Sequence, residues 1–252
     1  GAELLKAACC NLSESIETNP SVDVSYNDAV TGSKQIQMLG ISGNYTQLTV
    51  ENLPGPRGLA TPLGLNSIAG PWIESIQLTK GTGSVVNGFE SIAGQINVEL
   101  KKPESAEKLL GNIYVNDQGK TDLNLNVATK LNEKWATALL LHDNFMNNAL
   151  DMNMDGFKDM PTGNTFSLVN RYKYDNSNGV LAQFGVKVLN DQKVGGETSF
   201  NENSDKYTQN RYGLAINTQR YELFGKLGYI FPQQKFKSIG LQFNASDYQQ
   251  AS

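Results

Sequence analysis

The sequence has no long apolar run. None of its segments approaches the roughly 18 consecutive apolar residues that a membrane-spanning helix needs, and its mean hydropathy is −0.39 over 252 residues. The strands of a transmembrane β-barrel, however, alternate apolar with polar residues, so such a barrel also has low mean hydropathy. The sequence therefore predicts no spanning helix and leaves a barrel open.

Cysteine and histidine are also scarce. The two cysteines, Cys9 and Cys10, are adjacent, and His142 is the only histidine. Two thiols make a poor zinc site, which normally has four ligands, so we predict that both lie on the buried face of a short helix, with soft-metal binding as the alternative. No Ser/His/Asp or Cys/His arrangement is apparent, so the sequence predicts no enzyme.

Excess positive charge is absent as well. The net charge is −4, and the lysines and arginines are scattered along the chain. A nucleic-acid-binding protein usually carries a concentrated basic patch. We therefore predict no nucleic-acid partner.

The character of the sequence changes after residue 102. Residues 1–102 predict a mixed α+β domain, residues 103–108 a polar hinge, and residues 109–252 about eight antiparallel strands with no helix between them. In the first domain, strands are predicted at Ser21–Tyr26, Lys34–Leu39, Tyr45–Val50, Ile73–Thr79 and Gly94–Leu100.

The strands after residue 109 alternate apolar and polar residues with a period of two. Leu123 and Val127 fall on one face, and Asn124 and Asn126 fall on the other. The same pattern assigns Phe166, Leu168, Tyr172, Ala182, Phe184, Val186, Val188, Tyr212, Leu214, Ile216, Ile239, Leu241 and Phe243 to the apolar face, and His142 and Arg171 to the polar face. Such alternation predicts lipid outside and water inside a transmembrane barrel.

The connections between these strands alternate in length. Short turns are predicted at Asn132–Glu133, Asp175–Gly179 and Thr218–Gln219, and long loops at Phe145–Gly163 and Asn190–Lys206. Outer-membrane barrels have short turns at one end and long loops at the other. A soluble β-sandwich also alternates and is the alternative, but strands of about ten residues or more in up-and-down order favour the barrel.

The segment from Trp72 to Lys102 carries the most specific pattern. Its characteristic positions are Ile73, Glu74, Ile76, Lys80, Gly81, Ser84, Gly88, Ile92, Gly94, Ile96, Asn97 and Val98. This pattern resembles the plug domain of TonB-dependent outer-membrane receptors. The resemblance implies a plug over residues 1–102 inside a barrel of about 22 strands, because a narrower barrel has no room for a plug of this size. The chain is then expected to be the first part of a longer receptor.

The function that this resemblance implies is nutrient uptake. A receptor of this family would bind an iron chelate, cobalamin, a metal complex or an oligosaccharide and pass it to the periplasm. Its partners would be outer-membrane lipid and the TonB energy-coupling complex of the inner membrane. A structural or adhesive barrel without transport, and a soluble β-rich sugar-binding module, are the alternatives.

The resemblance also implies where the nutrient binds. The outward-facing plug loops would contact it through Asn27, Asp28, Thr31, Arg57, Leu59, Leu63 and Asn66. The sequence departs from the family at Ser75, where an arginine that pairs with barrel carboxylates is frequent. We therefore do not expect this position to anchor the plug.

One predicted loop resembles the start of a calcium-binding loop. Oxygen ligands would come from Asp151, Asn153, Asp155, the carbonyl of Phe157 and Asp159, with a glycine at the sixth position. Position 12, where a calcium loop has a bidentate Glu, is threonine, so weak calcium binding is predicted. The loop is also similar in location to the calcium-stabilised loop of cobalamin receptors. An Asx-rich turn without metal is the alternative.

Overall fold

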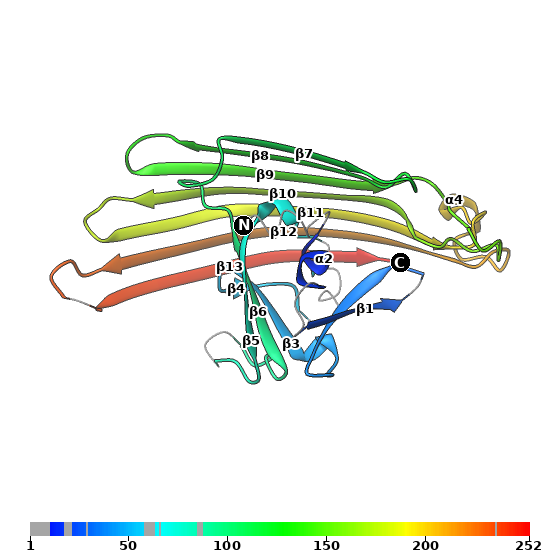
Figure 1. The fold of residues 1–252 in the computed structure, drawn as a ribbon, viewed down its shortest axis with the longest axis horizontal. Helices are drawn as coiled ribbons and strands as arrows, with labels where there is room; N and C mark the ends of the chain where they lie inside the picture. The colour runs from blue at the N-terminus through cyan, green and yellow to red at the C-terminus, as the bar shows by residue number, and fades with distance from the viewer. Residues whose placement is uncertain are drawn as a thin grey trace.

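A computed structural model of the chain describes residues 11–17, 22–28, 30–57, 64–65, 67–84, 88–234 and 236–252. Long strands lie side by side in one wide sheet, and the N-terminal region packs against one face of it (Figure 1). We refer to residues up to 102 as the plug and to the wide sheet as the wall.

The elements of the plug are α2 (Leu12–Glu17), β1 (Val22–Asp28), β2 (Ser33–Met38), η1 (Gly43–Tyr45), β3 (Thr46–Val50), β4 (Leu53–Pro54), η3 (Gly70–Trp72), β5 (Ile73–Lys80) and β6 (Gly94–Leu100). The wall consists of β7 (Leu109–Val115), β8 (Thr121–Lys130), β9 (Trp135–Met146), β10 (Thr162–Asp175), β11 (Val180–Gly196), β12 (Gly213–Ile230) and β13 (Ser238–Ala251), and α4 (Glu202–Asp205) precedes β12.

The plug contains two sheets. β1 and β2 form an antiparallel hairpin, and the other strands form a sheet in the order β4-β3-β6-β5, in which β3 and β6 are parallel. The five strands predicted in this region are all present, with ends within a few residues of the prediction. Gly94 begins β6 because a Cβ there would lie 2.6 Å from the carbonyl oxygen of Thr79, so the strand can approach β5 this closely only with glycine.

The wall is antiparallel and follows the order of the chain from β7 to β13. We predicted about eight strands, and the described residues form seven, because the turn predicted at Thr218–Gln219 is wrong. β12 pairs with β11 without interruption through both residues. Asn217 favours a turn next to these residues, but its pairing with Gln192 of β11 keeps it within the strand.

The wall has an apolar outer face and a polar inner face. On β8, Leu123, Leu125 and Val127 are exposed, whereas Asn124 and Asn126 are buried on the plug side. Alternation is therefore confirmed for this strand. The outer face also carries an aromatic group at the end with short turns, where the Trp135 and Tyr174 rings lie 4.9 Å apart.

The faces of β12 correct one assignment. Thr218 and Glu222 are buried and Tyr221 is half-exposed, so even-numbered residues of this strand face inward. Leu214 and Ile216 share this parity, and their predicted placement on the lipid face is wrong. The error follows from the turn predicted at Thr218–Gln219. Such a turn would have divided β12 into two strands, and the inward-facing parity could then have differed between them.

The main hydrophobic core joins the plug and the wall. Trp72 of the plug is 2% exposed, and it belongs to one cluster with Leu140 of β9 and Val169 of β10. The plug is thus seated on the wall by buried apolar side chains. Among the described residues, no helix is long and apolar enough to cross a membrane.

Candidate functional site: the interface between plug and wall

A tight turn of the plug points into the wall. Glu51 and Asn52 connect β3 to β4, with Val50 paired to Leu53. Their φ angles are 54° and 59°, which makes this a two-residue hairpin loop of the type that needs two left-handed residues. Glycine commonly occupies such positions, so a glutamate here has a reason beyond turn formation.

Glu51 contacts three strands of the wall. Arg171 of β10 donates to one carboxylate oxygen at 2.5 Å, and Gln183 of β11 donates to the other at 2.5 Å. Lys226 of β12 donates to the backbone carbonyl of Glu51. We call these four residues the clamp. Because a single plug residue is bonded to three neighbouring strands, the clamp fixes both the position and the direction of the turn.

The clamp is buried, and it sets the single carboxylate of Glu51 against two cations, Arg171 and Lys226. Glu51 is 5% exposed and Arg171 is 2% exposed. Burial raises the pKa of Glu51, but Arg171, Gln183 and Lys226 together outweigh it and hold the pKa below its ordinary value. Glu51 is therefore ionised at neutral pH, as its guanidinium partner requires.

Asn97 of the plug motif stabilises the Glu51–Asn52 turn from within the plug. Asn97 is 3% exposed, and its side-chain oxygen accepts from the backbone N–H of Asn52 at 2.8 Å and from the Thr49 hydroxyl at 2.9 Å. Its amide donates to Glu99 at 2.9 Å. Asn97 thus holds the turn in the shape that presents Glu51 to the wall.

A second plug-to-wall contact lies at the hinge. Lys173 of β10 donates to the carboxylate of Glu104, and both side chains are about one third exposed. Ser75 lies on β5 and forms neither contact. The plug is therefore anchored through acidic plug-side residues and basic wall residues, the reverse of the polarity that the family pattern led us to consider.

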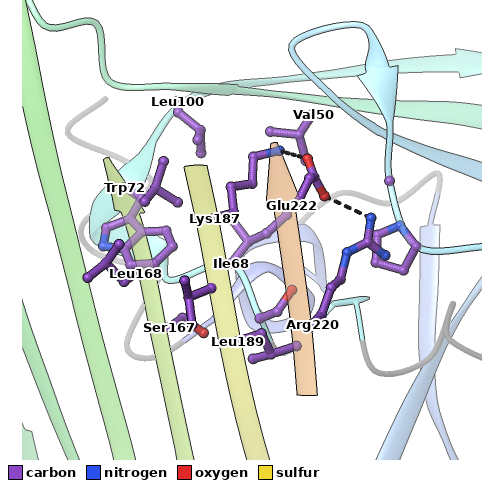
Figure 2. A pocket seen from close by; sticks show the side chains of 15 residues that line it. Val50, Ile68, Trp72, Leu100, Ser167, Leu168, Lys187, Leu189, Arg220 and Glu222 are labelled. Carbon is purple, nitrogen blue, oxygen red and sulfur yellow. Dashed lines mark hydrogen bonds and ion pairs between the residues drawn. The ribbon is translucent and has the colours of Figure 1, made fainter. Parts of the chain in front are cut away.

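Close to the clamp, plug and wall enclose a mostly apolar cavity of about 60 Å³ (Figure 2). Val50, Ile68, Trp72 and Leu100 line it from the plug side. This is room for on the order of five water molecules. The cavity is too small to hold a nutrient. It also means that the plug surface and the wall surface do not pack tightly against each other at this point.

The wall side of this cavity carries its own charges. Lys187 of β11 and Arg220 of β12 each lie 2.7 Å from a carboxylate oxygen of Glu222, as Figure 2 shows by dashed lines. All three residues belong to the wall. The wall therefore neutralises this carboxylate within itself and presents an already paired group to the apolar plug surface.

A larger cavity lies at the other end of the plug, beside the connections 147–161 and 197–212, which we call the long-loop end. Its volume is about 120 Å³, and it lies between the β1–β2 hairpin and the inner face of β8 to β11. The hairpin is close to the wall here: a Cβ at Gly195 would lie 1.8 Å from the carbonyl oxygen of Val30. Only glycine allows the backbones to approach this closely.

His142 links this cavity to the plug core. It lines the cavity, its Nδ1 lies 2.8 Å from the side-chain oxygen of Asn124, and its ring meets Trp72 edge to face with centroids 6.2 Å apart. The polar inner face predicted for His142 is confirmed. Its contacts are those of a structural residue between plug and wall.

The predicted nutrient-binding residues of the plug separate in the structure. Thr31 lines the long-loop cavity. Arg57 instead forms an ion pair with Glu90 at 3.2 Å within the plug. Asn27 and Asp28 lie at the end of β1, beside the turn that connects β1 to β2. Leu59, Leu63, Asn66, Cys9 and Cys10 fall outside the described residues.

The remaining motif residues shape the plug. Ile73 is buried, whereas Glu74 and Lys80 are exposed on β5. Gly81 and Gly88 have φ angles of 84° and 124°, which disfavour other residues. The motif therefore specifies the plug sheet and the clamp turn.

The loop predicted to bind calcium is closed by its own backbone. The carboxylate of Asp151 accepts from the N–H groups of Asp155 at 3.0 Å and Gly156 at 2.8 Å, and Asp159 accepts from Met152 N–H at 2.8 Å. Within the described ranges, no group of three or more His, Cys, Asp or Glu is arranged to hold a metal ion. Asp151, Asn153, Asp155 and Asp159 could supply oxygen ligands. Calcium binding stays a prediction, which calcium titration with Asp151→Asn as control would check.

The clamp was not predicted. Arg171 was placed on the inner face, but nothing in the sequence pairs it with Glu51, which lies 120 positions earlier. A signal was present in the Glu51-Asn52 dipeptide, since a glutamate in a two-residue hairpin turn is unusual.

Comparisons with known proteins agree with this architecture. Residues 1–95 match the family described as the TonB-dependent Receptor Plug Domain. The FrpB iron transporter from Neisseria meningitidis is 13% identical with a TM-score of 0.67, covering 98% of this chain and 39% of its own. The siderophore receptor PiuA from Acinetobacter baumannii is 13% identical with a TM-score of 0.69, covering 98% of this chain and 35% of its own.

A third solved structure is the ferric citrate transporter FecA, 16% identical with a TM-score of 0.68, covering 96% of this chain and 38% of its own. No curated protein matches the sequence. The chain thus spans about two fifths of the length of these solved receptors. Residues 1–95 thus match a TonB-dependent receptor plug domain, and the chain shares the fold of these solved receptors, with the plug seated on the inner face of an antiparallel wall.

Proposed function

We propose that this chain forms part of an outer-membrane receptor that takes up a scarce nutrient into the periplasm. The observation that carries the proposal is the long-loop cavity, which the plug hairpin and the wall line together. A nutrient bound there would touch both parts, so movement of the plug would change its site. The exposed apolar outer face of β7 to β13 would contact lipid, and the wall would belong to a barrel of about 22 strands.

The names of the solved relatives support one nutrient class. Their names describe iron, siderophore and ferric citrate transport, and another similar structure is the copper transporter OprC. A metal complex is therefore favoured over cobalamin or an oligosaccharide. Energy would come from the TonB complex of the inner membrane, because the periplasmic side has no nucleotide supply.

In this function the clamp would hold the resting plug. Glu51 joins three wall strands, so the plug cannot leave the wall until its bonds to Arg171, Gln183 and Lys226 break. Pulling by the inner-membrane partner would supply this work. The apolar cavity surface beside the clamp would then offer little further resistance to movement.

Uptake in cells tests the proposal. Cells that produce the receptor are expected to accumulate radiolabelled iron or copper complexes, and accumulation is expected to stop when the gene for the inner-membrane energiser is deleted. Uptake that persists after this deletion would favour a passive barrel, and absence of uptake for every complex would favour a structural or adhesive one. A chain that stays in the aqueous phase on detergent extraction would instead be a soluble module.

A further inference from the structure

Methionine is concentrated around one connection of the wall. The chain has five methionines, and four of them lie from the end of β9 to the start of β10: Met146, Met152, Met154 and Met160. Met146 and Met160 line the long-loop cavity. Met152 and Met154 instead lie in the middle of the connection and are 71% and 90% exposed. We call these two residues the thioether pair.

Core packing does not account for the thioether pair. Methionine is usually buried, where its flexible side chain fills gaps between other residues. Here two methionines on either side of Asn153 are exposed to solvent, and Met154 has a left-handed φ angle of 61°. A non-glycine residue keeps such a conformation only where its surroundings enforce it, and these conformations are frequent at functional sites. The exposure of this pair therefore points to a ligand.

The shape of the loop is fixed without the sulfur atoms. Asp151 and Asp159 accept hydrogen bonds from backbone N–H groups of the loop. At the base of the loop, the Lys158 N–H donates to the carbonyl of Gly196 at 2.9 Å. A hard cation would compete with the N–H groups for these carboxylate oxygens, whereas an ion held at sulfur would break none of these bonds. The loop is thus preorganised for a ligand of the thioether pair.

Both thioethers can reach one ion. Residues two apart along a chain have Cα atoms at most about 7 Å apart, and the unbranched methionine side chain has three rotatable bonds. The two sulfur atoms can therefore meet at a common point beside Asn153. Thioether sulfur is a soft ligand, which selects Cu(I) rather than hard cations such as Ca²⁺ or Mg²⁺.

The charge of the loop also favours a cation. Residues 151–159 contain three aspartates and one lysine, so their net charge is 1 − 3 = −2. The Lys158 Nζ lies 3.5 Å from the carbonyl oxygen of Val194 on β11. A negative loop raises the local concentration of cations. Methionine-rich surfaces can also make adaptable protein contacts, but the aspartates around this pair favour a metal ion.

From these observations we propose that Met152 and Met154 form a binding site for a soft monovalent metal ion such as Cu(I). The site is separate from the long-loop cavity, whose lining does not include either residue. The ion would be held by two thioether sulfur atoms, with no change in the oxidation state of metal or sulfur. The site does not depend on the proposed receptor function.

Silver titration of the purified full chain in detergent micelles tests the inference, with Ag(I) as an air-stable substitute for Cu(I). The titration uses a Cys9→Ser, Cys10→Ser background, because thiolates are soft ligands as well. Calorimetry measures the affinity, and NMR of isotope-labelled methionine methyl groups locates the ion. We expect the methyl signals of Met152 and Met154 to shift. Replacing both residues, by Met152→Leu with Met154→Leu, should weaken silver binding about tenfold or more.

Met38→Leu is the matched control, since it removes a fully buried thioether of the plug and should leave the silver affinity unchanged. Calcium is the hard-ion probe and should not displace silver. Unchanged silver affinity in the double variant, displacement of silver by calcium, or shifts confined to Met146 and Met160 would overturn the inference. Silver binding at the thioether pair without energiser-dependent uptake would confirm the site and contradict the receptor function alone.

Discussion

The clamp and the apolar cavity are neighbouring parts of one interface, yet they hold the plug in opposite ways. At the clamp, plug and wall share charges, because Glu51 belongs to the plug and Arg171 to the wall. At the cavity, Lys187 and Glu222 pair within the wall, and the plug contributes apolar side chains. Of these two places, the clamp thus holds the plug through directional bonds and the cavity surface holds it through non-directional apolar contact. A plug held in this way can be released by breaking few bonds.

The largest expected effect comes from Glu51→Gln. This change leaves Arg171, which is 2% exposed, without a counter-charge. Removing one partner of a buried ion pair destabilises by about 3–5 kcal/mol. We expect this loss in the free energy of unfolding measured by urea titration in micelles, together with faster proteolysis of the plug.

Glu74→Gln is the control, because Glu74 is an exposed glutamate of the same domain. Equal stability of the two variants would mean that the clamp does not hold the plug. A double variant, Glu51→Gln with Arg171→Met, removes both charges and should recover much of the lost stability.

The next largest effect is expected when the pH is lowered. The pKa of Glu51 is lowered in the folded protein, so its contribution is complete above the ordinary glutamate pKa of about 4.3. The contribution is lost as the pH falls through the lowered pKa, because protonation removes the partner of Arg171. Protease protection of the plug should therefore decline below about pH 4.3, and a Glu51→Gln variant should lack this part of the decline.

A smaller effect is expected at the apolar cavity. Ile68 is 7% exposed and lines the cavity, so Ile68→Val enlarges it by one methylene group. The expected cost is about 0.5–1.5 kcal/mol, and salt should not change it because no charge is involved. A salt-dependent loss in chemical unfolding would show that this surface is coupled to the clamp.

The smallest effect is expected at the hinge. Glu104 and Lys173 are each about one third exposed, so water screens their ion pair. Glu104→Gln should cost at most about 1 kcal/mol, and high salt should erase the difference from the unchanged protein. A loss as large as that of Glu51→Gln in the same urea titration would place a second anchor at the hinge.

Much of the fold could be predicted because it depends on local patterns. The period of two in β8 identified its inner and outer faces, and the glycines and Asn97 of the plug motif marked the plug sheet. The error at Thr218 arose where β12 continues through a segment that strand-length expectations had divided. A strand of 18 residues exceeds the usual length, and only its pairing with β11 reveals it.

The candidate site was less predictable because it depends on docking. The inner-face placement of His142 was predictable from its parity, whereas the nutrient contact predicted for Thr31 stays a prediction, although Thr31 lines the long-loop cavity. The meeting of Lys34, Lys120 and Lys193 depends on how the hairpin lies against the wall, and Gly195 permits that approach. No single-sequence pattern specifies such a meeting of separate elements.

The left-handed backbone of Glu51 has a consequence for the order of folding. A non-glycine residue held at φ 54° costs about 1–3 kcal/mol, and this conformation persists only where its surroundings enforce it. Those surroundings include Arg171, Gln183 and Lys226, which are synthesised long after Glu51. We therefore expect this hairpin to reach its final shape only when β10 to β12 are in place.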